Sequence, residues 1–303
     1  SFGYFIIIAR NIGVENTGKF SFALSFAALF AMFLDFGLNQ VLIRESARDS
    51  ETNQKNLANV VGLKIIGSVI IYGAIFLLVN LMGYPELTRQ LVYVAGLVML
   101  IDSFALSFFS VLRGRHNLSY ESICVVTNQI LVVVFGLSAI YFNLGLVALI
   151  SAYVFGSAFN FFFTAWVLKR KYQIIPKVSF NKEIIKKIWK IALPFGIAGI
   201  FIRIYSSMDM VLLSKLADDA SMGLYSVAFK ITFALQFIGV AFSASVYPAF
   251  CSYFIHSKEL LAQTFVKAMR YLLIISLPLS FGLISIADKV IGPIFGNEYV
   301  PAI

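Results

Sequence analysis

The sequence LANVVGLKIIGSVIIYGAIFLLVNLM, from Leu57 to Met82, decides the fold of this chain. An apolar run of this length predicts a membrane-spanning helix, because about 20 apolar residues cross the hydrocarbon core. Lys64 interrupts the run. A charge deep in a span costs roughly 2.5–3.5 kcal/mol on the insertion scale unless it faces other protein or water. The segment therefore predicts a helix that packs around a wet or charge-paired interior.

Similar runs fill most of the chain. Its 303 residues are 60% apolar and only 13% charged, and the mean hydropathy is +0.88. A soluble domain has about 25% charged residues, and continuous rather than alternating apolar runs exclude a membrane β-barrel. We therefore predict an all-α polytopic membrane protein and expect the chain to be an internal part of a longer protein. The predicted spans are residues 1–9, 19–43, 57–82, 90–112, 118–141, 145–168, 188–213, 223–250 and 262–285, with a tenth beginning near Val290.

The basic residues are unevenly distributed between alternate loops. Fourteen of the 24 Lys and Arg follow the second, fourth, sixth and eighth spans, and only five lie in the other loops. Short loops rich in Lys and Arg stay cytoplasmic, which gives the orientation. The net charge of +9 is then explained by the membrane orientation and by contact with anionic membrane lipid. No nucleic-acid partner is therefore expected. The predicted location is the cytoplasmic (inner) cell membrane, with multiple passes.

The longest polar stretch lies near the middle of the chain. Within it, residues 181–190 place apolar and cationic side chains on opposite helical faces, which is typical of an interfacial helix. A shift of 205 residues aligns the second span with the eighth, with Gly18 on Gly223. Parallel repeats of six helices have this relation. We predict an N-terminal lobe at 1–170, a cytoplasmic linker at 171–190 and an incomplete C-terminal lobe at 191–303.

Six charged residues within the spans are the candidate substrate or cavity residues. Counted at about 1.5 Å per residue, the depth of Lys64 matches those of two acids, so it is predicted to pair with Asp35 or Asp102. The full set is Asp35, Lys64, Asp102, Arg203, Asp209 and Lys230.

The other three charges lie deeper or nearer the outer surface. Asp209 and Lys230 share a depth near the outer side and are predicted to pair. Arg203 lies near mid-membrane with no acid of matching depth, and it is predicted to contact a diphosphate or an acidic sugar, because guanidinium holds phosphate or carboxylate through two parallel hydrogen bonds.

Polar and aromatic side chains in the spans are candidates for sugar contacts. Interhelical hydrogen bonds use the same residue types, so each is open to a structural interpretation. These candidates are Asn128, Gln129, Asn160, Tyr205 and Gln236. Cys124 and Cys251 are interpreted as small buried hydrophobes. We predict no metal site and no cofactor, with transport coupled to protons or sodium.

Several motifs extend over nearly the whole chain. They are ARNIGVENTGKFSFA (Ala9–Ala23), DFGL (Asp35–Leu38), DMVLLSKL (Asp209–Leu216), MGLYSVAFK (Met222–Lys230), Tyr247-Pro248 and FGNEY (Phe295–Tyr299). With these motifs the chain resembles Wzx-type polysaccharide flippases of the multidrug, oligosaccharidyl-lipid and polysaccharide exporter superfamily. The resemblance implies two six-helix lobes around a central cavity, worked by alternating access.

The leading functional hypothesis is a flippase, not an enzyme, that moves undecaprenyl-diphosphate-linked oligosaccharide to the outer leaflet during polysaccharide or O-antigen biosynthesis. Its expected partners are that lipid-linked oligosaccharide and other membrane proteins of polysaccharide assembly. One alternative is a small-cation or drug antiporter of the same superfamily, which would favour an acid-dominated cavity over three acids and three bases. The other is a membrane-embedded glycosyltransferase or polymerase, which would need a larger outer loop or a set of catalytic acids.

Overall fold

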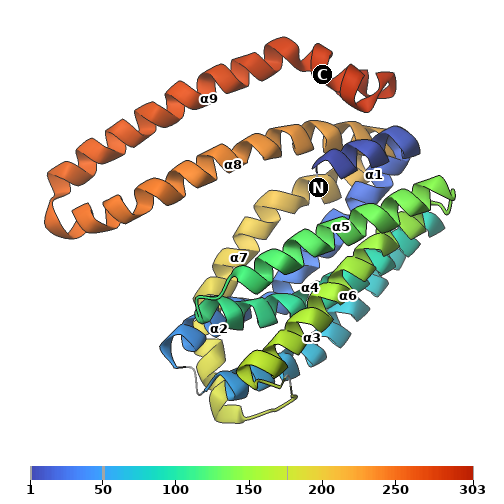
Figure 1. Cartoon of the computed structure of the whole chain (residues 1–303). Helices are drawn as coiled ribbons and strands as arrows, with labels where there is room; N and C mark the ends of the chain where they lie inside the picture. The colour runs from blue at the N-terminus through green and yellow to red at the C-terminus, as the bar shows by residue number, and fades with distance from the viewer. Residues whose placement is uncertain (1, 50–51, 176, 303) are drawn as a thin grey trace. The chain divides into compact units, whose positions relative to one another are not determined.

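The computed structural model describes residues 2–49, 52–175 and 177–302, except for the side chains of ten residues between 240 and 256. Cys251 and the Tyr247-Pro248 pair lie outside the described side chains. All the secondary structure described is helical (Figure 1). The elements are α1 (Phe2–Asp35), α2 (Leu38–Arg48), α3 (Asn53–Leu81), α4 (Glu86–Gly114), α5 (Ser119–Tyr141), α6 (Leu146–Tyr172), α7 (Lys182–Leu216), α8 (Asp219–His256), α9 (Lys258–Phe295) and the 3₁₀ helix η1 (Asn297–Ala302).

Eight of the described helices are long and apolar enough to cross a membrane, which confirms the predicted class of all-α polytopic membrane protein. The chain forms two compact units: residues 15–222 make up the first, and residues 2–14 with 223–303 the second. The sequence-based lobes, with a linker at 171–190, stay a prediction about the whole transporter. The compact units divide the chain at Val14 and Met222 instead.

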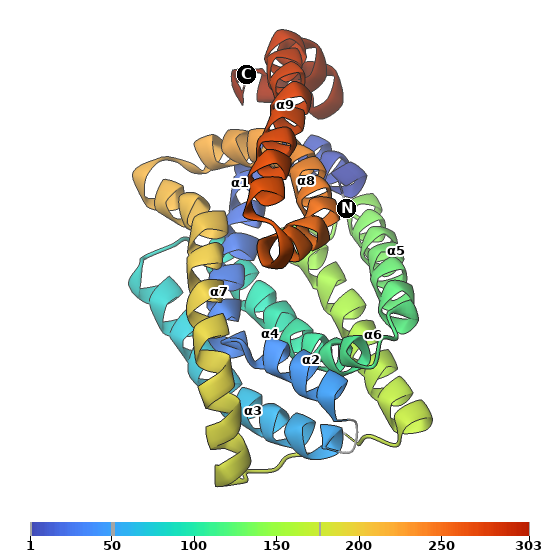
Figure 2. The ribbon, with the colours of Figure 1, turned by 90° about the vertical axis from the view of Figure 1, so that its left-hand side faces the viewer.

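In the first unit, α4 packs against α2, α3 and α6, and α5 lies along α6 (Figure 2). The core beneath α4 contains Phe108 and Leu112, both almost fully buried, together with Leu42 of α2 and Leu57 of α3. The tight interior follows from the sequence, since large apolar side chains on these faces fill the space between helices. Cys124 also belongs to this core and is buried, as predicted.

The predicted span 19–43 is not one helix. Phe36 and Gly37 both have positive φ, 30° and 75°, and separate α1 from α2. Glycine tolerates this left-handed conformation without steric cost. A Cβ at Gly37 would also lie 2.5 Å from the carbonyl oxygen of Ala192, so only glycine lets α7 approach. Apolar periodicity continues through residues 36–37, which is why the sequence pattern missed the break.

In the second unit, the first turns of α1 pack on the end of α9 and on η1. Phe5 and Phe295 contact edge to face at 6.3 Å between ring centres, and the hydroxyl of Tyr299 donates to the carbonyl oxygen of Ala9 at 2.9 Å. Two expectations are wrong here. The loop predicted after residue 9 is only a kink at Gly13, which has φ 77°, and no tenth span begins near Val290, because α9 continues to Phe295.

The predicted linker, residues 171–190, docks on the N-terminal end of α3. Gln54 exchanges two hydrogen bonds with the backbone of Ile175, donating at 2.6 Å and accepting at 2.7 Å. The side chain of Asn59 accepts from the backbone N–H of Asn181 at 2.6 Å, and Asn181 caps α7 through its own side chain. The predicted amphipathic helix is thus the first part of α7, continuous with the span that follows.

Both ends of α7 contact other segments of the first unit, to which α7 itself belongs. At its start, Lys187 forms an ion pair with Glu45 of α2. At its end, the ammonium of Lys215 donates to the carbonyl oxygen of Met82 at 2.5 Å and lies 4.0 Å from the ring centre of Tyr84. The hydroxyls of Tyr84 and Ser214 are 2.6 Å apart. These contacts fix where the middle of α7 lies relative to α1 and α4.

Candidate functional site

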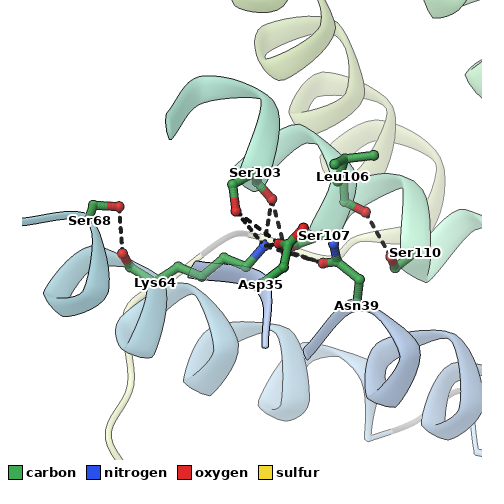
Figure 3. Close-up of polar contacts among 8 residues, drawn as sticks. All are labelled: Asp35, Asn39, Lys64, Ser68, Ser103, Leu106, Ser107 and Ser110. Atoms are coloured by element: carbon green, nitrogen blue, oxygen red, sulfur yellow. Dashed lines mark hydrogen bonds and ion pairs between the residues drawn. The ribbon is translucent and has the colours of Figure 1, made fainter. Parts of the chain in front are cut away.

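A buried ammonium organises the polar interior of the first unit. The side chain of Lys64 on α3 is 0% exposed. Its Nζ donates to Asp35 Oδ1 at 2.5 Å and to the carbonyl oxygen and Oγ of Ser103 at 2.7 and 2.8 Å (Figure 3). A longer contact of 3.3 Å reaches Asn39 Oδ1. A buried charge needs such partners, because an unpaired one would be very costly.

The helix break supplies two of these partners. Asp35 is the last residue of α1, and Asn39 lies in the first turn of α2. Figure 3 shows both side chains meeting the Lys64 ammonium from the two sides of the break. Residues four apart lie on one face of a continuous helix. Asp35 and Asn39 are also four apart, and across the break both still reach the same atom, Lys64 Nζ. A discontinuous helix beside a charge at membrane depth is a known way of building transporter sites.

Two serines on α4 complete the cluster. Ser103 Oγ donates to Asp35 Oδ1 at 3.0 Å, and Ser107 Oγ donates to Asn39 Oδ1 at 2.9 Å. They are four residues apart and so share one face of the helix. Sequence reasoning missed Asn39, Ser103 and Ser107. The signal was present, because Ser103 and Ser107 lie four residues apart within an apolar run, next to the predicted cavity residue Asp102.

A cavity of about 270 Å³ lies beside this cluster, within the first unit. Its charged lining residues are Asp35 from α1, Asp102 from α4 and Arg203 from α7. Small side chains such as Ala28 and Ala31 line the α1 side. The cavity thus brings together two acids and a base from three helices that are far apart in sequence.

Two of the sequence predictions about charge pairing can be compared with this geometry. Lys64 pairs with Asp35, which confirms one of the two predicted partners, while Asp102 lies on the cavity wall. Arg203 lines the same cavity as Asp35 and Asp102, and no ion pair joins its guanidinium to an acid in the described part of the chain. The expectation that no acid matches its depth stays a prediction.

The predicted pair of Asp209 and Lys230 falls on different compact units and stays a prediction. Asp209 is half-buried, and its Oδ1 accepts from the backbone N–H of Met210 at 2.8 Å. Lys230 is also half-buried, and its Nζ lies 5.2 Å from the ring centre of Phe5. Such a cation–aromatic contact gives a buried ammonium partial compensation.

The five candidates for sugar contacts are scattered, and the described lining of the cavity contains none of them. Tyr205 and Gln236 are exposed, whereas Asn160 is 7% exposed, with an Oδ1 that has no partner among the described residues. Asn128 approaches Gly156 of α6 closely enough that a Cβ there would lie 2.6 Å from Asn128 Oδ1.

That contact indicates helix packing for Asn128, and a role in sugar binding stays a prediction for all five residues. Gln129 is half-buried on α5. Across the described part of the chain, no group of three or more His, Cys, Asp or Glu is arranged to hold a metal ion.

The eight candidate spans define a multi-pass helical membrane protein. The family described as "Polysaccharide biosynthesis protein" matches residues 1–254. The chain belongs to this family, in agreement with the resemblance to Wzx-type flippases.

Two curated relatives are similar in sequence. The probable low-salt glycan biosynthesis flippase Agl15 of Haloferax volcanii is 22% identical over 297 residues, which cover 97% of this chain and 61% of the relative. The teichuronic acid biosynthesis protein TuaB of Bacillus subtilis is 24% identical over 102 residues, which cover 33% of this chain and 21% of TuaB. The chain thus spans about three fifths of the length of Agl15.

Solved structures share the fold. An inward-facing multidrug resistance transporter of the MATE family, in the MOP superfamily, has a TM-score of 0.68 at 18% identity, covering 99% of this chain and 74% of that structure. An outward-facing structure of a transporter of the same family has a TM-score of 0.57 at 18% identity, covering 99% and 72%. The chain therefore shares the fold of these MATE-family structures.

Proposed function

We propose that the protein is a flippase that moves an oligosaccharide linked to undecaprenyl diphosphate from the inner to the outer leaflet of the cytoplasmic membrane. Membership of the polysaccharide biosynthesis family supports this proposal, and so does the similarity to Agl15, a probable glycan biosynthesis flippase. The structural observation that carries it is the cavity with Asp35, Asp102 and Arg203 on its wall. Charged groups are kept within spans when they face a substrate path.

Alternating access would carry the saccharide through this interior. A polar saccharide cannot cross hydrocarbon without losing its hydrogen bonds with water, and each unsatisfied group is costly. Carboxylate and guanidinium groups on a cavity wall replace those bonds. Protons or sodium are the proposed coupling ions, and no chemical step on the substrate is required, so the protein is proposed to be a transporter and not an enzyme.

The amphipathic start of α7 is proposed to rest on anionic lipid at the cytoplasmic surface. Lys182, Lys186 and Lys190 are exposed there, and Trp189 is 42% exposed. Cationic and aromatic side chains of this kind suit the lipid headgroup region. Other membrane proteins of polysaccharide assembly are proposed partners on the grounds of family membership alone.

Deleting the gene and analysing membrane lipids tests the proposal. Lipid-linked oligosaccharide should accumulate on the inner leaflet, and the wild-type gene should reverse this. A small-cation antiporter is the second candidate, favoured by the two carboxylates on the cavity wall. It predicts unchanged lipid-linked saccharides together with increased drug sensitivity, and this result would refute the flippase.

The variant Arg203→Ala refines the test. A substrate role predicts loss of export at a near-normal amount of membrane protein, with partial recovery in Arg203→Lys, because ammonium cannot form two parallel hydrogen bonds. A structural role predicts less folded protein, because a buried acid would be left unpaired. Normal export in Arg203→Ala would dismiss both roles.

A further inference from the structure

The cavity wall presents hydrogen-bonding groups that the protein itself leaves unused. Asp35 accepts through Oδ1 from Lys64 and Ser103, and in the described structure no hydrogen bond reaches its Oδ2. The Asp35 side chain is 27% exposed and lines the cavity. Arg203 is exposed, and its guanidinium has no ion-pair or hydrogen-bond partner among the described residues. The Oδ2 atom of Asp35 therefore remains available as a hydrogen-bond acceptor for a ligand, and the guanidinium N–H groups of Arg203 remain available as donors.

We infer that this cavity binds one hydroxyl-rich sugar ring of the transported saccharide, rather than its diphosphate. The inference rests on the proposed function and names the part of the substrate that this cavity recognises. It differs from both ligands that the sequence suggested for Arg203, a diphosphate and an acidic sugar, and it rests on groups that only the fold brings together.

Charge balance disfavours the diphosphate. The negative charge of Asp35 is matched by Lys64 at 2.5 Å, and that of Asp102 by the one remaining cation, Arg203, on the same wall. The site is therefore close to neutral. A diphosphate would bring its negative charges next to two carboxylates inside a region of low dielectric, where like charges repel strongly. A neutral ring brings no such repulsion.

Hydroxyl chemistry fits the groups that are present. A sugar hydroxyl both donates and accepts, whereas a carboxylate only accepts and a guanidinium only donates. A ring between Asp35 and Arg203 can satisfy both groups, and hydrogen bonds to charged groups are the stronger kind. Most of the remaining wall is apolar, with residues such as Ala28, Ala31 and Met99. This suits the C–H faces of a sugar ring.

The size of the cavity limits what can enter. Its volume of about 270 Å³ lies just below the roughly 300–1,000 Å³ typical of pockets for small molecules. That is room for a single ring and not for an oligosaccharide. The lipid diphosphate and the remaining sugars would therefore lie outside this cavity, and selectivity would concern one sugar of the repeat unit.

Binding measurements on the full-length protein in lipid nanodiscs test the inference, with native mass spectrometry as the readout. The first probe is the pool of lipid-linked saccharides extracted from the source organism, and the second is undecaprenyl diphosphate without sugar. Arg203→Gln removes the guanidinium donors from the wall, and Ala28→Leu fills the cavity. Each variant should bind the saccharide-bearing pool about 10-fold or more weakly, Arg203→Gln because it loses a hydrogen bond to a charged group and Ala28→Leu because the ring no longer fits. Each should bind undecaprenyl diphosphate as the wild type does.

Ala198→Leu is the matched control, because it makes the same substitution at an exposed position of α7 that does not line the cavity; it should bind both probes as the wild type does. If both probes weakened equally in Arg203→Gln and Ala28→Leu, the cavity would not be a sugar site. Unchanged binding of the saccharide pool in these two variants would overturn the inference and leave the proposed function standing. If the wild-type protein bound neither probe, the proposed function would fall, and the inference with it.

Discussion

Replacing Asp35 by Asn should destabilise the protein more than replacing Lys64 by Met, although both changes break the same ion pair. The difference follows from burial, since the Lys64 side chain is 0% exposed and that of Asp35 is 27% exposed. Asp35→Asn leaves a fully buried ammonium with neutral partners only, and stranding a buried charge costs about 3–5 kcal/mol. Ser103 and Asn39 remain as acceptors for the ammonium. The expected loss in free energy of unfolding is therefore near the lower end of that range, at about 3 kcal/mol.

Lys64→Met leaves a carboxylate that the cavity water and the Ser103 hydroxyl can solvate. Met also fills most of the space of the lysine stem, so the expected loss is about 1–2 kcal/mol. In the double variant Asp35→Asn/Lys64→Met neither charge remains. It should therefore be more stable than Asp35→Asn alone, with a coupling free energy of about 2 kcal/mol.

The assay is unfolding of the purified protein in mixed micelles, with the free energy of unfolding measured for each variant of the cycle. Lys169→Met, at an exposed position near the end of α6, is the matched control and should behave like the wild type. Equal losses for the two single variants would refute the argument from burial. A double variant whose loss equals the sum of the single losses would refute the pairing itself.

Three further predictions concern topology and packing. A cysteine at Lys182 should resist an impermeant thiol reagent added to intact cells, whereas one at Ala220 should react; labelling at Lys182 would overturn the orientation drawn from the basic loops. Exchanging the charges of Asp209 and Lys230 together should recover more protein or export than either single reversal, and additive losses would exclude that pair. Gly196→Val should cost about 1–3 kcal/mol and lower the yield of folded protein, because a Cβ there would lie 2.7 Å from the Phe36 ring; wild-type thermal stability would contradict this close contact.

The sequence by itself determined the class of the protein and most of its spans. Apolar runs such as Leu57–Met82 leave a membrane helix as the only structure that satisfies every backbone group in lipid, and α3 (Asn53–Leu81) agrees with this run. It also determined that Lys64 needs a partner, because an isolated charge in a span is costly. These conclusions depend on composition along one helix, which the sequence contains in full.

The tertiary structure decided which residues meet. Depth along a span cannot say which way a side chain points around its helix, so Asp35 and Asp102 were equal candidates for Lys64 until the fold placed Asp35 Oδ1 at 2.5 Å. The break at Gly37 depends on how closely α7 approaches, which apolar periodicity does not record. Arg203 reaches the cavity because contacts at both ends of α7 fix the position of that helix. Those contacts join residues more than a hundred positions apart, and only packing in three dimensions selects them.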